Sequence, residues 1–152
     1  MRVCIYEDRC ECFDPVALVR PVFELLCGQE SLRAKIERRL AGNAFTYAVR
    51  EELAALFKHQ NPDLTVNESL ASPKEDVLFV NGRLLASSFV PARDGAEEVG
   101  QAGDEVVYVR AKAASIAAAD GATAREKVAS LEGKQPAKGV EATVIGWIWE
   151  LI

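Results

Sequence analysis

The segment DVLFVNGR at positions 76–83 decides the fold that this 152-residue chain is expected to adopt. Four consecutive apolar residues, Val77 to Val80, stand between an acidic residue and a turn-forming Asn-Gly pair. An uninterrupted apolar run of this length is typical of a strand that is buried on both faces. Because such a strand needs a layer of helices on each side of its sheet, the segment predicts an α/β protein.

Strand and helix patterns alternate on the N-terminal side of this segment. Short apolar runs at 2–6 and 45–49 predict two further strands. Ser31 is a suitable N-cap for an amphipathic helix that ends at Gly42, and 51–59 predicts a second helix. Alternation of this kind favours a parallel sheet with helices packed against it.

The C-terminal half is predicted to add shorter elements. These are strands at 83–90 and 105–110, helices at 112–119 and 123–131, loops at 94–103 and 133–139, and an apolar end at 144–152. Trp147 and Trp149 alternate like residues on one face of a strand, and we expect them to pack in the core or against another domain rather than to stack on a base. The prediction is one domain over residues 1–152, a Rossmann-like three-layer α/β sandwich with a mostly parallel sheet.

The composition limits the classes of function. Hydrophobic residues make up 49% of the chain and charged residues 27%, and the net charge is −5. A broad nucleic-acid surface needs a basic face, so nucleic acid is not an expected partner. A local arginine cluster can still bind a small phosphate ligand on an acidic protein. No run approaches the roughly 20 apolar residues of a membrane span, so we expect a cytoplasmic protein without a membrane partner.

All of the cysteines lie near the N-terminus. They are Cys4, Cys10, Cys12 and Cys27. The spacing of Cys10 and Cys12 is not that of a usual zinc-ligand pair, and the single histidine, His59, is distant. Reduced thiols are the expected state in the cytosol, and a zinc site or a disulfide are the alternatives.

Several short motifs occur in a characteristic order. Residues 20–33, RPVFELLCGQESLR, join an Arg-Pro pair, an apolar stretch, Gly28 and the start of a helix. Glu7-Asp8 follows the first strand, Asn81-Gly82-Arg83 ends a later one, and Trp147-Ile148-Trp149-Glu150-Leu151 closes the chain. This order resembles the sugar-nucleotide pyrophosphorylases. It is most similar to a divergent branch related to the bacterial bifunctional N-acetylglucosamine-1-phosphate uridyltransferase/glucosamine-1-phosphate acetyltransferase.

The resemblance implies a nucleotidyltransferase that joins a sugar 1-phosphate to a nucleoside triphosphate and releases pyrophosphate. It implies that Arg20 and Arg83 are the catalytic, phosphate-binding residues and that Glu7 and Asp8 hold Mg²⁺. The implied substrate-binding residues are Glu7, Asp8, Arg9, Asn81, Gly82 and Gly103. The resemblance also implies that this domain precedes a left-handed β-helix, so a C-terminal β-helix domain or a second copy of the chain is the expected protein partner.

Three departures from the family pattern leave other functions open. Residues 7–19 contain no glycine, although active relatives have a glycine-rich loop there. The lysine of the family's Pro-Lys pair is absent, and its Gly-Asp pair is matched by Gly82-Arg83, whose arginine is not a metal ligand. The alternatives are a nucleotide- or sugar-phosphate-binding or regulatory domain without turnover, and a structural module that packs on a β-helix.

Overall fold

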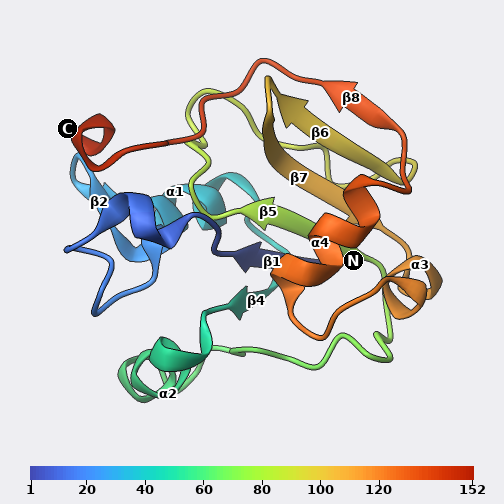
Figure 1. Cartoon of the computed structure of the whole chain (residues 1–152), viewed down its shortest axis with the longest axis horizontal. Helices are drawn as coiled ribbons and strands as arrows, with labels where there is room; N and C mark the ends of the chain where they lie inside the picture. The colour runs from blue at the N-terminus through green and yellow to red at the C-terminus, as the bar shows by residue number, and fades with distance from the viewer.

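A six-stranded sheet forms the centre of the molecule, which is described for residues 1–152 by a computed structural model (Figure 1). Its strand order is β4-β1-β5-β7-β6-β8, and β2 and β3 form a separate hairpin. The strands are β1 (Arg2–Tyr6), β2 (Leu26–Cys27), β3 (Glu30–Ser31), β4 (Ala44–Ala48), β5 (Val77–Asn81), β6 (Glu98–Ala102), β7 (Glu105–Ala111) and β8 (Ala137–Gly139). The helices are α1 (Leu32–Arg39), α2 (Glu51–Gln60), α3 (Ala113–Ala118) and α4 (Ala124–Glu132), and the 3₁₀ helices are η1 (Cys10–Phe13), η2 (Val22–Glu24) and η3 (Ile148–Leu151).

The strands β4, β1 and β5 are parallel and in register. Tyr6 pairs with Ala48 on one side and with Asn81 on the other, so the three strands end at one edge of the sheet. β8 is parallel to β6, whereas β7 is antiparallel to both β5 and β6. β7 is antiparallel to β6 because a tight turn, with Gly103 in the left-handed conformation, joins these two strands. The sheet is therefore mixed but mostly parallel, and the predicted fold class is confirmed.

Helices cover both faces of the sheet, which makes the three layers. The core on one face combines α1, α2, β1 and β5 through Ile36, Leu40, Leu53, Phe57, Val3, Ile5, Leu78 and Val80. The core on the other face combines α3, α4 and the same strands through Ile116, Val128, Leu131, Cys4, Tyr6, Val77 and Phe79. Alternate residues of β5 thus enter opposite cores, as a strand buried on both faces requires. None of the helices combines the length and the apolar character that crossing a membrane needs.

Capping residues set the helix boundaries much as the sequence predicts. The Ser31 hydroxyl accepts a hydrogen bond from the Ala34 N–H (3.1 Å) at the start of α1. Thr123 and Glu126 form a reciprocal capping box at the start of α4. The buried Lys127 ammonium donates to carbonyl oxygens near the end of α3, which satisfies acceptors that the helix leaves free.

Two regions that the sequence predicts as loops contain strands in the structure. The stretch 94–103, predicted as a loop, contains β6, in which Gly100 lies directly under the ring of Tyr108 and has no room for a Cβ atom. A glycine that allows close packing therefore resembles a loop signal in the sequence. The loop predicted at 133–139 likewise ends in the short strand β8.

Two predictions are wrong. They are the strand at 83–90 and the strand-like alternation of Trp147 and Trp149 at the C-terminus. After β5 the chain leaves the sheet, and only Leu84 forms an isolated bridge, with Val144. Trp147 and Trp149 lie beside and within η3 rather than on a strand. Their indole rings stack with centroids 5.1 Å apart and remain 44% and 62% exposed, so they do not enter the core.

Candidate functional site

The carboxyl ends of β1, β4 and β5 bring polar side chains from three segments to one edge of the sheet. This polar edge consists of Glu7, Asp8, Arg9, Arg50, Asn81, Arg83 and Glu105. The start of β7 contributes Glu105 because β7 runs antiparallel to β5. Open α/β sheets bind their ligands outside the carboxyl ends of the strands, so the polar edge is the candidate site.

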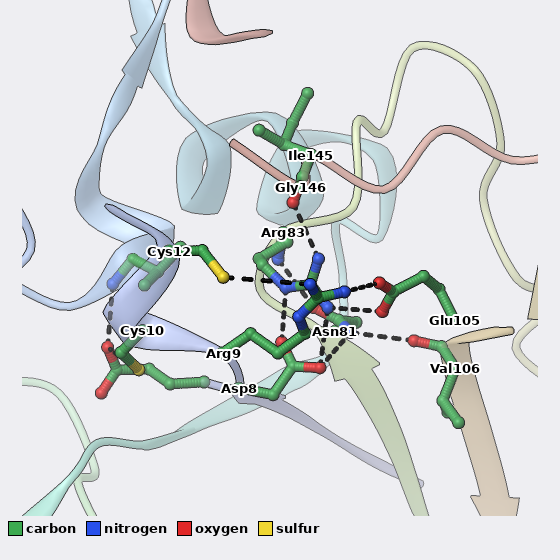
Figure 2. A network of polar contacts seen from close by, with 12 residues as sticks. Asp8, Arg9, Cys10, Cys12, Asn81, Arg83, Glu105, Val106, Ile145 and Gly146 are labelled. Carbon is green, nitrogen blue, oxygen red and sulfur yellow. Dashed lines mark hydrogen bonds and ion pairs between the residues drawn. The ribbon is translucent and has the colours of Figure 1, made fainter. Parts of the chain in front are cut away.

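Arg83 is the centre of the polar edge (Figure 2). Its guanidinium is 0% exposed and donates to both oxygens of Asp8, from Nε at 2.6 Å and from Nη2 at 2.9 Å. Nη2 also donates to Glu105 Oε2 (2.7 Å), and Nη1 donates to the Ile145 carbonyl oxygen (2.8 Å). Burial by itself lowers the pKa of Arg83, but the hydrogen bonds and charges of the two carboxylates outweigh it, so the pKa is raised.

In this arrangement Arg83 binds carboxylates, whereas the sequence predicts that it binds a phosphate. A guanidinium without exposed surface, already shared between two carboxylates, offers no free donor to a ligand in the described conformation. Arg20, by contrast, is exposed, and its side chain makes no ion pair. The two arginines therefore do not form the joint clamp that the sequence predicts, because one is part of the protein interior and the other faces solvent.

The predicted turn residues Asn81 and Gly82 fix the geometry around Arg83. The Asn81 side chain accepts from the Arg83 N–H (2.9 Å) and donates to Asp8 Oδ2 (3.1 Å) and to the Val106 carbonyl oxygen (2.8 Å). At Gly82 a Cβ atom would lie 2.9 Å from the Tyr6 carbonyl oxygen, so only glycine allows this close approach. Both residues hold the end of β5 beside the start of the Glu7-Asp8 segment.

Glu7 and Arg50 form the second ion pair of the polar edge. Glu7 is buried and accepts hydrogen bonds from the Val22 N–H (2.9 Å), the Arg50 N–H (3.0 Å) and Arg50 Nη1 (2.8 Å). Arg50 also donates to the Ala17 carbonyl oxygen. The pair therefore anchors residues 8–21, the segment that follows β1. Sequence reasoning missed Arg50, although its position directly after the predicted strand 45–49 is the same signal that singled out Glu7.

Arg9 and Gly103 also lie at this edge. Arg9 adopts a left-handed backbone conformation (φ 45°) and forms an ion pair with Glu105, and its side chain remains 43% exposed. Gly103 lies in the β6–β7 turn, two residues before Glu105, with open space around the position of a Cβ atom. The structure thus brings together every predicted site residue except the exposed Arg20 side chain.

The predicted Mg²⁺ ligands do not fit a metal ion as they stand. Both oxygens of Glu7 accept from Val22 or Arg50, and both oxygens of Asp8 accept from Arg83. No group of three or more His, Cys, Asp or Glu side chains is arranged to hold a metal ion. A carboxylate that is neutralised by a buried arginine is a poor Mg²⁺ ligand, because the cation would have to displace the guanidinium.

The four cysteines are free thiols. Burial and the neighbouring Glu7 carboxylate raise the pKa of the Cys10 thiol to about 11, and burial raises that of Cys4 to about 12. We expect iodoacetamide at about pH 8 to alkylate Cys10 roughly a hundredfold and Cys4 roughly a thousandfold more slowly than in the unfolded chain, because the thiolate is the nucleophile. Mass spectrometry of timed samples measures these rates. Labelling in denaturant is the control, and Cys10 alkylation at the unfolded rate contradicts the assignment.

The three-layer fold defines a Rossmann-like α/β domain, and the polar edge is its candidate ligand site at the carboxyl ends of the parallel strands. Comparison with protein families is more specific. The family model described as sugar nucleotidyl transferase matches residues 3–152, so the chain belongs to the sugar nucleotidyl transferase family, a family of nucleotidyltransferase enzymes. None of the curated proteins compared with the chain matches it.

Proposed function

We propose that this chain transfers a nucleotidyl group from a nucleoside triphosphate to a sugar 1-phosphate, and that it binds both substrates at the polar edge. The observation that carries the proposal is the family match over residues 3–152. The polar edge supports it, because charged side chains from four segments meet where this class of fold binds ligands. In the reaction a phosphate oxygen of the sugar phosphate attacks the α-phosphorus, the bond to the β-phosphate oxygen breaks, and pyrophosphate leaves.

Two cations are the candidates for direct phosphate contact: Arg9, which belongs to the polar edge, and Arg20, whose backbone carbonyl oxygen accepts a hydrogen bond from Arg50 beside it. Arg20 faces solvent without an ion-pair partner, and Arg9 is partly exposed although it is paired with Glu105. Arg83 takes a different role in this proposal from the one implied by the sequence: it is a positioning residue that holds Asp8 and Glu105. The backbone at Gly82 and Gly103 lies at the same edge and stays a proposed substrate contact.

The test is release of pyrophosphate from a panel of nucleoside triphosphates and sugar 1-phosphates, with and without added Mg²⁺. We expect release that requires both substrates and produces a sugar nucleotide detectable by mass spectrometry. An Arg20→Gln variant should release pyrophosphate about tenfold more slowly if this cation contacts the transferring phosphates. Absence of release for every substrate pair would contradict catalysis by this chain.

A second function, ligand binding without turnover, is favoured by one observation. The two carboxylates that the sequence assigns to Mg²⁺ are both engaged by arginines. A binding or regulatory domain would keep the fold and the edge but no metal ligands. It predicts that nucleotides or sugar phosphates raise the melting temperature without any product, and a melting temperature unchanged across the panel would exclude it.

The relation to the bacterial bifunctional uridyltransferase/acetyltransferase, and with it a following β-helix domain, stays a proposal. The exposed Trp147–Trp149 stack supports it, because large aromatic surfaces left in water are typical of contacts with another domain or a second copy. Hexapeptide repeats in the reading frame after Ile152 would support the β-helix, and a different sequence there would contradict it. The free thiols support the cytoplasm as the compartment, which localisation of the tagged protein would test.

A further inference from the structure

A hollow of about 580 Å³ lies beside α1. Its lining residues come from the turn between β2 and β3, from α1 and from Ala86 and Ser87. It shares no residue with the polar edge. Only two of its nine lining residues are hydrophobic, so its chemistry suits a polar ligand rather than an apolar one.

The hollow is basic, although the chain as a whole carries a net charge of −5. Lys35, Arg38 and Arg39 line it, against a single carboxylate, that of Glu30. Arg38 pairs with Glu30 at 2.7 Å. Lys35 and Arg39 form no ion pair and no hydrogen bond with another residue, so two cations stay available for an anion. Clustered free cations of this kind attract phosphate groups.

The turn between β2 and β3 adds backbone donors to these charges. Gly28 is in the left-handed conformation (φ 72°), and a Cβ atom at this position would meet nothing within 4 Å. The N–H groups of Gly28 and Gln29, which both line the hollow, donate to no other backbone group. Free N–H groups in a turn beside cations are the usual donors to phosphate oxygens.

We propose that this hollow binds the diphosphate group of a small molecule, with Lys35, Arg39 and the turn N–H groups as its ligands. Its volume lies within the range of small-molecule sites, roughly 300 to 1,000 Å³, so it accommodates a nucleoside diphosphate as well as free pyrophosphate. This site is separate from the proposed substrate edge. Binding there does not depend on whether the chain transfers nucleotides, and the two proposals fail independently.

The test is a ¹H–¹⁵N NMR titration of the full chain with inorganic pyrophosphate at about 0.15 M ionic strength. We expect saturable shifts of the Gly28 and Gln29 amide signals. The double variant Lys35→Gln/Arg39→Gln should raise the Kd for these shifts about tenfold or more, because it removes both unpaired cations. The NMR spectrum of this variant without ligand reports whether its fold is intact. We expect an intact fold, since neither side chain forms an ion pair or a hydrogen bond.

The matched control is Lys74→Gln/Arg125→Gln, which removes the same net charge from two exposed cations that also lack ion pairs. Its Kd should stay within about twofold of the original, because separated surface charges are screened beyond about 8 Å. A parallel titration with uridine diphosphate shows which part of the ligand the hollow recognises. An affinity equal to that for pyrophosphate shows that only the diphosphate group is bound, and a higher affinity shows that the nucleoside also enters the hollow. Shifts confined to the polar edge, or equal loss of affinity in both double variants, would overturn the proposal.

Discussion

Replacing Arg83 with methionine is expected to lower the free energy of unfolding by about 3 kcal/mol. Methionine fills a similar volume but leaves Asp8, Glu105 and the Ile145 carbonyl oxygen without their donor. Removing one partner of a buried ion pair is costly because the other charges lose compensation in a medium that solvates them poorly. Urea unfolding followed by circular dichroism measures the change.

The control for this prediction is Arg20→Met, which removes an arginine that is exposed and unpaired. Its free energy of unfolding should change by less than about 0.5 kcal/mol. In a double-mutant cycle, Asp8→Asn should cost less in the Arg83→Met background than in the original chain, since the carboxylate is already uncompensated there. A loss below about 1 kcal/mol for Arg83→Met, or additive effects in the cycle, would show that Arg83 is not the centre of the polar edge.

Replacing Glu7 with glutamine is expected to lower the free energy of unfolding by about 2 to 3 kcal/mol. Donors from Val22 and Arg50 reach both carboxylate oxygens, so either orientation of the glutamine amide places a donor against a donor. The same change removes the negative charge that compensates Arg50. Because Glu7 also anchors residues 8–21, we expect proteolysis of this segment to accelerate together with the loss of stability.

Glu11→Gln provides the matched control, since Glu11 lies in the same segment, is exposed and makes no ion pair. It should unfold at the same urea concentration as the original chain. Limited proteolysis of the two variants, with fragments assigned by mass spectrometry, separates local from global effects. Cleavage within residues 8–21 at equal rates in both variants would contradict the anchoring role of Glu7.

The sequence predicted much of the central fold because the signals for it are local. The apolar run Val77–Val80, the cap at Ser31 and the shorter runs at 2–6 and 45–49 each lie within a few residues. The structure confirms strands or a helix at each place. Gly100 is the counterexample, because a glycine that admits the Tyr108 ring into the space beside β6 is indistinguishable in sequence from a loop glycine.

The sequence also placed Glu7, Asp8, Asn81 and Arg83 at one edge, since residues that follow parallel strands end at the same side of a sheet. It did not predict that Arg50 and Glu105 join them. Only the tertiary structure decided what they do there. Asp8 and Arg83 are 75 positions apart, and Glu7 and Arg50 are 43 apart, so no local pattern reveals that they pair. Whether a guanidinium meets a phosphate or a carboxylate depends on its burial, and burial results from the packing of segments that are distant in the chain.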